Sequence, residues 1–397
     1  MRKFSADFIF PVSRAPIANG IIITEDDGLI VEIIDPEKID YKIDDVKFHR
    51  GILTPGFVNS HCHLELSFLK NKIEKNTGLD VFIKEIELKR KEKEEKVIEA
   101  IDDAEKEMIA NGIIAVGDIS NNDFTFKQKS KKNIYYHTFI EVFSFDAMKA
   151  DSAFERGNFL AEKLITVGSL LAYSITPHAP YSCSKELFIN LINKAKINSD
   201  FLTIHNQENE EENLFFNSKT GKLVERLKYF GINLEVWKEP KKSSLQYIID
   251  LSDPEVKMQL VHNTVTKEVD IDYALNKNKN LWWCLCPGAN LYIENKLPDV
   301  NLLFQKVKDR ITIGTDSLAS NENLSVLEEI KILQQNYPFL SLEELIKWST
   351  LNGAEFLEID NWCGSLEKGK KPGINLITLI DLRMFEFNEN SGVIKLI

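Results

Sequence analysis

The chain has 397 residues, with 49 Lys and Arg against 61 Asp and Glu, so its formal net charge at pH 7 is −12 and its isoelectric point is about 5.3. Nucleic acid is bound mainly by neutralising phosphates with cationic side chains, and this excess of acidic residues excludes it as an expected partner. No stretch approaches the ~18 consecutive apolar residues of a membrane span. Asp7 and Pro11 interrupt the short apolar patch at the N-terminus, which does not resemble a signal peptide, so we expect a cytoplasmic protein without a membrane partner.

The cysteines do not suggest a disulfide framework. They are Cys62, Cys183, Cys284, Cys286 and Cys363. An odd number in a long chain without a secretory signal favours free thiols. The pair in LWWCLCP lies in an apolar run that predicts a strand and lacks the two-residue spacer of a zinc knuckle, so we expect buried thiols.

The chain begins with short alternating or β-branched runs, KFSADFIF and GIIIT, which predict a small antiparallel sheet. After residue 52, short apolar runs alternate with helical stretches. These include single helices over 79–111, 152–166 and 184–197 and two helices over 322–357. Eight strands are predicted to begin near residues 54, 113, 134, 170, 201, 257, 281 and 311. Strands that alternate with helices in this number indicate a closed (β/α)8 TIM barrel, in the α/β class.

The charged stretch 84–107 has many opposite-sign neighbours at i, i+3 and i, i+4, so we interpret it as a solvated helix of the barrel. The last 35 residues return to the β pattern of the beginning. We therefore expect two domains. Residues 1–52 and 358–397 would form a small β-sandwich from both chain ends, and residues 53–357 the barrel.

Five of the seven histidines fall at or next to the ends of predicted strands: His61, His63, His178, His205 and His262. In such barrels the active site lies at this rim. Alternation along an extended segment points His61 and His63 to the same side. With His205 and Asp316 they predict a site for one metal ion with room for water, the alternative being rim residues bonded to one another without metal.

Five segments together resemble the amidohydrolase superfamily: TPGFVNSHCHLELS, HAPYSCS at 178, His205 with Glu208 three residues on, LVH ending at His262, and GTDS at 314–317. The C-terminal GSLEKGKKPGINLI also resembles the small β domain of that family. The similarity is greatest to the mononuclear-zinc branch, which includes purine, nucleoside and cytosine deaminases and triazine chlorohydrolases.

The resemblance implies one divalent metal ion, Zn²⁺ or Fe²⁺, bound by His61, His63, His205 and Asp316. It implies that Glu208, His262 and Asp316 act in catalysis on the bound water and the substrate. Glu210, Glu211 and Glu212, which follow Glu208, are expected to be only solvated. Binuclear relatives have a carboxylated lysine at the end of strand four, where this chain has Ser174 to Pro177, which favours one ion.

Several further residues have expected roles near the site. His178 and Glu141 are predicted to contact the substrate, although a structural role is open for both. Asn290 in CPGAN matches a family position and is expected to support the site from outside. His49 and His137 have no motif and are expected to be structural.

The preferred interpretation is a hydrolytic deaminase in which zinc-bound hydroxide attacks the amino-bearing carbon of a heterocycle and ammonia leaves. A purine or adenine-type nucleoside derivative is the expected small-molecule partner. The same residues can serve hydrolytic dechlorination or cyclic amide hydrolysis, because the loops select the leaving group. A non-catalytic barrel that only binds is the alternative from another class. Whether the chain forms a homo-oligomer stays open.

Overall fold

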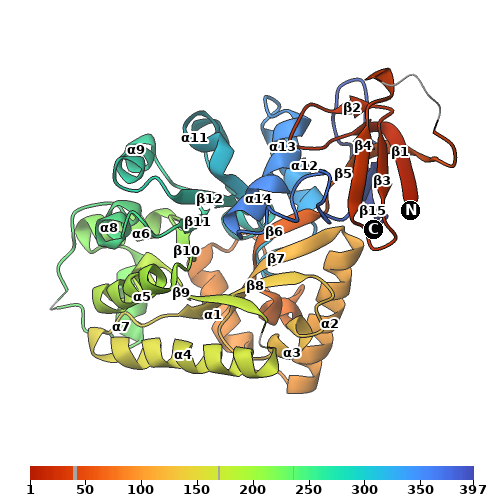
Figure 1. Ribbon diagram of the computed structural model, residues 1–397. Helices are drawn as coiled ribbons and strands as arrows, with labels where there is room; N and C mark the ends of the chain where they lie inside the picture. The colour runs from red at the N-terminus through yellow and green to blue at the C-terminus, as the bar shows by residue number, and fades with distance from the viewer. Residues whose placement is uncertain (39–42, 169, 236) are drawn as a thin grey trace.

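The computed structural model describes residues 1–38, 43–168, 170–235 and 237–397 (Figure 1). Strands and helices alternate through the middle of the chain, and both chain ends lie in a sheet at one side of the molecule. No helix in these ranges is long and apolar enough to cross a membrane. The five cysteines are free and buried, as predicted.

The middle of the chain contains two parallel sheets of four strands each. The first has the order β6-β7-β8-β9 and the second β10-β11-β12-β13, so neighbours in sequence are neighbours in space. Their bounds are β6 Phe57–Cys62, β7 Ile113–Ser120, β8 Tyr135–Val142, β9 Ala172–Pro177, β10 Leu202–Asn206, β11 Met258–His262, β12 Leu281–Leu285 and β13 Ile311–Ile313. All eight begin within three residues of the predicted positions.

The two sheets meet at both of their edges. Cys62, which ends β6, forms a parallel bridge with Asp316 beyond β13. At the other edge the backbone N–H of Thr203 donates to the hydroxyl of Thr176 at 3.0 Å, which joins β10 to β9. The carboxyl ends of all eight strands therefore lie toward one rim, as in barrels of parallel strands.

Helices follow most strands, and several begin at a serine, aspartate or asparagine whose side chain accepts a backbone N–H of the first turn, as at Ser184, Ser243, Ser325 and Ser341. The helices are α1 Leu79–Lys89, α2 Glu94–Ala110, α3 Phe126–Lys129, α4 Ala150–Val167, α5 Lys185–Asn198, α6 Glu210–Ser218, α7 Lys222–Tyr229, α8 Ser244–Leu251, α9 Glu268–Lys277, α10 Pro287–Glu294, α11 Val300–Val307, α12 Val326–Asn336, α13 Leu342–Trp348 and α14 Leu351–Phe356.

The single helix predicted over 79–111 is wrong, because residues 90–93 separate α1 from α2. Lys93 has an extended backbone, with ψ 137°, and precedes the first turn of α2. The two helices also pack differently. Ile101 and Met108 of α2 belong to the main core, whereas Phe82 of α1 belongs to another apolar cluster. Likewise, the region 322–357 contains three helices rather than two.

Strands from both chain ends form one seven-stranded sheet in the order β15-β14-β5-β1-β3-β4, with β2 paired to β1. The strands are β1 Arg2–Ile9, β2 Ile17–Ala18, β3 Ile21–Thr24, β4 Ile30–Ile34, β5 Lys47–Thr54, β14 Asn375–Thr378 and β15 Gly392–Lys395. The central strand β5 is parallel to β1 and antiparallel to β14. All pairings of these described strands belong to one sheet, so the second sheet that a sandwich requires is not among them.

Candidate active site

The residues predicted to carry chemistry lie at the carboxyl ends of the parallel strands. They are His61 and His63 at the end of β6, His205 in β10, His262 at the end of β11, and Asp316 three residues beyond β13. All five are buried. Asp316 and His262 have left-handed backbones, with φ of +58° and +74°, a conformation that is uncommon outside glycine and that clusters at functional sites.

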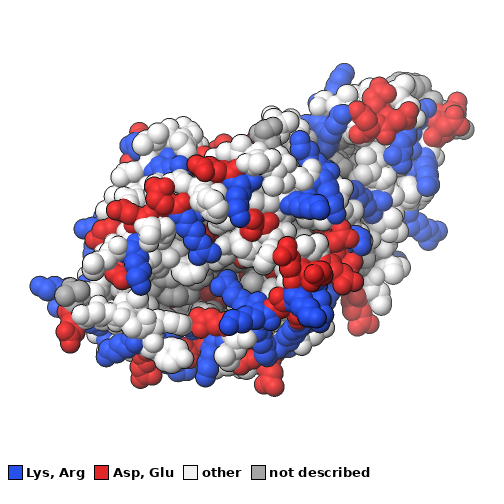
Figure 2. All heavy atoms as spheres, turned by 90° about the horizontal axis from the view of Figure 1, so that it is seen from below, with Lys and Arg blue, Asp and Glu red and all other residues white. Residues whose placement is uncertain are grey.

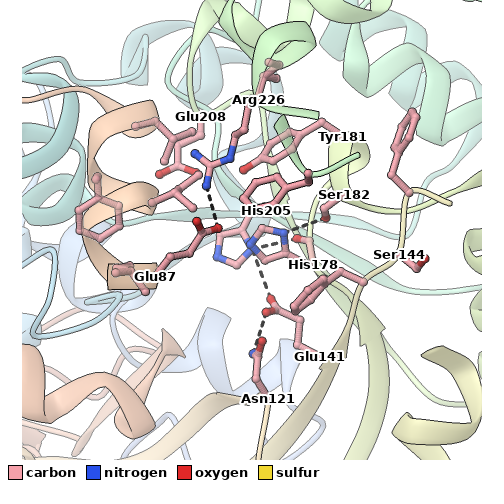
Figure 3. A pocket seen from close by; sticks show the side chains of 18 of the residues that line it. Glu87, Asn121, Glu141, Ser144, His178, Tyr181, Ser182, His205, Glu208 and Arg226 are labelled. Atoms are coloured by element: carbon pink, nitrogen blue, oxygen red, sulfur yellow. Dashed lines mark hydrogen bonds and ion pairs between the residues drawn. The ribbon is translucent and has the colours of Figure 1, made fainter. Parts of the chain in front are cut away.

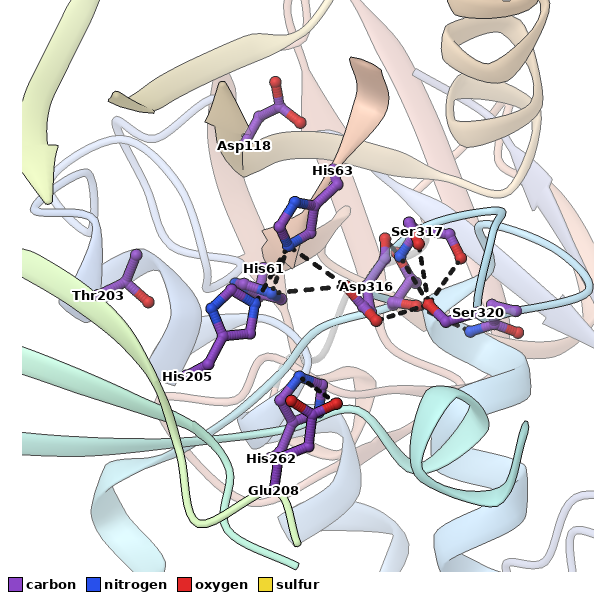
Figure 4. A network of polar contacts seen from close by, with 12 residues as sticks. His61, His63, Asp118, Thr203, His205, Glu208, His262, Asp316, Ser317 and Ser320 are labelled. Atoms are coloured by element: carbon purple, nitrogen blue, oxygen red, sulfur yellow. Dashed lines mark hydrogen bonds and ion pairs between the residues drawn. The ribbon is translucent and has the colours of Figure 1, made fainter. Parts of the chain in front are cut away.

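His61, His63, His205 and Asp316 form a compact cluster (Figure 4). Nε2 of His63 lies 3.2 Å from Nε2 of His61 and 3.2 Å from Nε2 of His205. Oδ1 of Asp316 lies 3.4 Å from Nε2 of His63 and 3.7 Å from Nε2 of His61. Ligands at about 2.0–2.1 Å from one tetrahedral ion lie about 3.4 Å apart, so this spacing fits a single divalent ion.

Burial sets the protonation of these groups. It lowers the pKa of His205 to about 4 and of His262 to about 3, and it lowers the pKa of His63 well below its usual value. The imidazoles are therefore neutral at pH 7, which is the form that binds a metal. Burial alone would raise the pKa of Asp316, but the surrounding histidines lower it well below its usual range, so the carboxylate is ionised.

Hydrogen bonds orient two of the four side chains. Nδ1 of His205 lies 2.9 Å from the carbonyl oxygen of His178, to which it donates when Nε2 is the ring's free acceptor. The hydroxyl of Ser320 donates to Oδ2 of Asp316 at 2.5 Å, so Oδ1 is left to face the histidines. Nothing in the sequence pattern predicted Ser320.

A buried ion pair lies behind the cluster. Oδ2 of Asp118 in β7 is 2.6 Å from Nζ of Lys129 in α3, and both side chains have 0% exposure. Oδ1 of the same carboxylate accepts the backbone N–H of Leu64 at 2.8 Å. Since Leu64 directly follows His63, the ion pair fixes the segment that carries two of the clustered histidines.

Glu208 lies on the pocket side of the cluster, and its Oε1 is 3.8 Å from Nε2 of His262. Burial raises the pKa of Glu208 well above its usual value, and the charge of Asp316 raises it further. The prediction that Glu212 is only solvated is wrong. Its side chain is buried, and its carboxylate accepts the backbone N–H groups of Gln207 at 3.0 Å and Glu208 at 2.9 Å. Glu210 is exposed and Glu211 is half-buried.

The cluster opens into a pocket of about 450 Å³ (Figure 3). His178 and Glu141, predicted to contact substrate, both line it. Nδ1 of His178 lies 2.8 Å from the hydroxyl of Ser182. Oε2 of Glu141 accepts the side-chain N–H of Asn121 at 2.8 Å, while its Oε1 lies 3.6 Å from Nδ1 of His205. The structure thus brings the predicted contact residues to the wall beside the metal cluster.

Glu65 lines the same wall and was not predicted. Its Oε2 accepts the backbone N–H groups of Asn121 at 3.0 Å and Asn122 at 3.2 Å, and burial raises its pKa to about 8. It lies in a short 3-10 helix, Leu64–Leu69, that begins directly after His63, so the alternation of the preceding strand does not extend to it.

The part of the pocket remote from the cluster is mostly apolar. Side chains of α1 and α7 line it: Leu79, Phe82, Ile83, Ile86, Leu223 and Leu227. Assigning residues 84–107 to one solvated helix was therefore wrong for its first part, because Ile86, Glu87 and Arg90 face the pocket. Spacing at i, i+3, i+4 and i+7 from Leu79 to Ile86 was the available signal.

The remaining predicted residues lie outside the pocket lining. Asn290 donates to the hydroxyl of Thr264 at 2.6 Å, two residues beyond His262. His137 is buried with Nε2 2.9 Å from the hydroxyl of Ser174. His49 belongs to β5 in the terminal sheet.

A sequence model described as the amidohydrolase family matches residues 52–397. The chain belongs to the amidohydrolase family. The predicted resemblance is thus confirmed, and with it the prediction of an enzyme. The family and its solved structures imply a TIM barrel, with which the two parallel sheets agree.

Individual relatives of this amidohydrolase cover most of its length. An adenosine deaminase of Helicobacter pylori is 26% identical over 378 residues, which are 91% of this chain and 86% of that protein. The crystal structure of H. pylori aminofutalosine deaminase in complex with methylthio-coformycin has a TM-score of 0.80 at 21% identity, covering 98% of this chain and 94% of the other. A zinc-bound adenosine deaminase from Xanthomonas campestris has a TM-score of 0.73 at 19% identity, covering 96% and 85%.

Proposed function

We propose that this amidohydrolase is a metal-dependent deaminase that releases ammonia from an adenine-type nucleoside or a related purine. The observation that carries the proposal is the convergence of a four-ligand metal cluster and the Glu208–His262 pair on one pocket. The similarity to an adenosine deaminase and an aminofutalosine deaminase supports the substrate class.

In this proposal His61, His63, His205 and Asp316 hold one divalent ion, and the zinc-bound relative supports Zn²⁺. When bound, such an ion lowers the pKa of a coordinated water molecule toward 7 and so makes it a nucleophile at neutral pH. The neutral imidazoles of His63 and His205 and the ionised carboxylate of Asp316 are the protonation states that metal binding requires.

The protons are moved by this chain's own carboxyl groups. The carboxylate of Asp316, which lies beside the histidines of the cluster, is the acceptor for the proton of the attacking water. Burial raises the pKa of Glu208 and so favours its protonated form, from which it donates to a ring nitrogen of the substrate. The water oxygen bonds to the ring carbon and gives a tetrahedral adduct. Asp316 passes the proton that it took from the water to the amino nitrogen, the bond from the ring carbon to that nitrogen breaks, and ammonia leaves. The remaining hydroxyl proton of the adduct returns to Glu208. Neutral His262 hydrogen-bonds the reacting centre from the side of Glu208.

We propose that His178 and Glu141 hold the heterocycle against the cluster. Both are on the wall formed after β8 and β9, and the oxygen of Glu141 that faces His205 has no hydrogen-bond partner within the described structure. A buried, unpaired acceptor beside a pocket favours a ligand that supplies a donor.

We also propose three further features: a closed barrel, a separate terminal β domain and a cytoplasmic location. The contacts of β6 with the segment after β13, and of β9 with β10, support closure into one (β/α)8 barrel over 53–357. The seven-stranded sheet supports a small β domain from 1–52 and 358–397. Five free cysteines support the cytoplasm as the compartment.

Ammonia release from a panel of adenine nucleosides, free purines and pyrimidines tests the proposal with the zinc-loaded protein. We expect turnover of at least one adenine nucleoside and none with the His61→Ala protein. Chloride release from a chlorotriazine in place of ammonia release from the panel would assign the site to another leaving group. A zinc-loaded protein that binds nucleosides but turns over none would favour a binding module.

A further inference from the structure

Two helices from different loops lie over the pocket. α1 follows β6 and α7 follows β10, and both contribute side chains to the pocket lining. Each packs into its own apolar cluster. Leu79 and Phe82 of α1 pack with Leu69 and Ile293, whereas the buried face of α7 packs with aromatic residues of α6. Within the described part of the chain, the two helices therefore share no apolar cluster that would hold one against the other.

A single arginine of α7 reaches α1. Nη2 of Arg226 is 3.1 Å from Oε1 of Glu87 (Figure 3). Its Nη1 is 3.6 Å from Oδ1 of Asp80 and 3.3 Å from the carbonyl oxygen of Asp80. Asp80 and Glu87 are two helical turns apart, so they lie on the same face of α1. Among the described residues, these contacts are the only hydrogen bonds and ion pairs between α1 and α7.

The burial of Arg226 favours a single geometry for its contacts with α1. Its side chain has only 12% exposure, while those of Asp80 and Glu87 have 42% and 41%. A planar guanidinium offers donors in a fixed fork, so two partners on one face restrain it more than one partner would. Its guanidinium also lies 5.6 Å from the ring centre of Phe230.

Each end of α1 has a further polar contact. The backbone N–H of Leu79 donates to Oε1 of Glu294 in α10 at 2.7 Å, which holds the first turn. At the other end Nζ of Lys89 donates to the carbonyl oxygen of Lys72 at 2.5 Å, and Ile86 packs against the same apolar cluster as Phe82. These contacts hold α1 to α10 and to the segment before α1, whereas Arg226 links it to α7.

We propose that Arg226 is a positioning residue for substrate specificity. Its contacts hold α1 against α7 and thereby set the width of that part of the pocket that lies away from the metal cluster. In the proposed reaction this is where the part of the nucleoside that extends beyond the base and sugar lies. Arg226 acts through α1 and takes no part in the chemical step. The activity test below rests on the proposed function, whereas the exchange test does not.

The kinetic test compares adenosine with adenine nucleosides that carry apolar 5′ substituents of increasing length. For Arg226→Met we expect KM to rise about threefold to tenfold for the longest substituents, the size of effect of a partly exposed ion-pair link. We expect kcat for every substrate and KM for adenosine to change less than about twofold. Lys228→Met, an exposed change on the same helix, is the matched control. An equal rise in KM for all substrates, or a loss of kcat, would overturn the proposal.

The exchange test needs no substrate. Hydrogen exchange of the zinc-loaded protein should become faster in residues 79–89 for Arg226→Met, with the strands β6 to β13 unchanged. Glu87→Gln should give a smaller effect in the same segment, and the double variant should be no worse than Arg226→Met, because both changes remove one link. Unchanged exchange in α1 for Arg226→Met, or additive effects of Arg226→Met and Glu87→Gln, would refute the link between α1 and α7 even if every nucleoside were turned over. Failure of all nucleosides to react would count against the proposed function and leave the exchange result decisive for Arg226.

Discussion

Glu208 and Glu212 have the same side chain and lie one helical turn apart in sequence, yet the structure gives them different surroundings. Both oxygens of Glu212 accept backbone N–H groups, so this carboxylate holds the loop that follows His205. The carboxyl group of Glu208 faces the pocket and His262. Glu212 therefore positions Glu208, and only Glu208 is placed to exchange a proton with a ligand.

Replacing Glu208 by Gln should keep the shape of the side chain and remove the proton transfer. We expect kcat/KM to fall about 100-fold to 10,000-fold, the usual contribution of a general acid or base, with unchanged zinc content. Asp316→Asn should lower both activity and zinc content, because Oδ1 of Asp316 belongs to the metal cluster. Steady-state kinetics and metal analysis measure the two quantities. Glu210→Gln is the matched control, and a comparable loss there would contradict the assignment.

At the scale of residues, the sequence predicted the side chains of the metal cluster and missed the residues that position them. His61, His63 and His205 could be predicted because histidine is uncommon in this chain and each lies at the end of a recognisable strand, and Asp316 because it lies in the GTDS segment. Ser320 and Lys129 could not, because serine and lysine are frequent everywhere. Their roles arise only when the fold brings them to Asp316 and Asp118.

At the scale of elements, the strands were predicted well because a buried parallel strand is a short continuous apolar run between turns. The separation of α1 from α2 was missed because Arg90 to Lys93 are residues that a helix readily accepts. What ends α1 is a difference in packing partners, and this depends on where α10 and the core lie. Sequence pattern alone does not contain that information.

The contact of α3 with β7 should be important for stability. Lys129→Met would leave the carboxylate of Asp118 buried without its cation, and we expect the free energy of unfolding to fall by about 3–5 kcal/mol. Urea denaturation with a tryptophan signal measures this change. Lys127→Met, exposed on the same short helix, should change stability by less than about 0.5 kcal/mol. A loss below about 1 kcal/mol for Lys129→Met would mean that the pair contributes little.

The segment after β13 reaches the metal cluster because Gly314 has no side chain. A Cβ atom there would lie 2.8 Å from Cβ and 2.9 Å from the carbonyl oxygen of His61. That same carbonyl accepts the N–H groups of Thr315 at 3.0 Å and Asp316 at 3.1 Å, so displacement would move a ligand.

Gly314→Ala should therefore weaken zinc binding by about 10-fold to 100-fold, in the range of changes to groups that support metal ligands. Competition with a chelator of known affinity measures the change. The control is Gly392→Ala, where the nearest atom to an added Cβ is 3.9 Å away. Zinc affinity equal to that of the unchanged protein would show that β13 can shift without moving Asp316.

At the scale of the whole molecule, the surface and the core contribute differently to stability. Figure 2 shows Lys and Arg side chains interspersed with Asp and Glu side chains over one face. Helix α2 has exposed pairs of this kind, such as Lys106 with Asp102 at 2.7 Å. Such pairs contribute little free energy of unfolding, so the buried apolar clusters must provide most of it.

The terminal sheet and the parallel strands share part of that core. Ile52 and Ile377 of the terminal sheet, and Phe10 directly after β1, belong to the same buried cluster as Met108 and Trp283. We therefore predict that the protein unfolds in one cooperative transition. Ile377→Ala should shift the midpoint seen by the tryptophans, with a loss of about 2–5 kcal/mol, whereas Ile394→Ala at 50% exposure should change it little. Two separate calorimetric transitions would show that the sheet folds as an independent unit.

The pairing of β5 with β14 also means that β5 remains without one of its partner strands during synthesis of the chain. Ile52 pairs with Ile377, which the ribosome adds 325 residues later. At roughly 5–20 residues per second, about 15–65 s pass before this partner is made. Throughout that interval one edge of β5 offers unpaired backbone groups and the buried side chains Ile52 and Leu53 to any other strand. Protection of β5 during synthesis, by a chaperone or by the part of the barrel already folded, is therefore a requirement that this topology imposes on the cell.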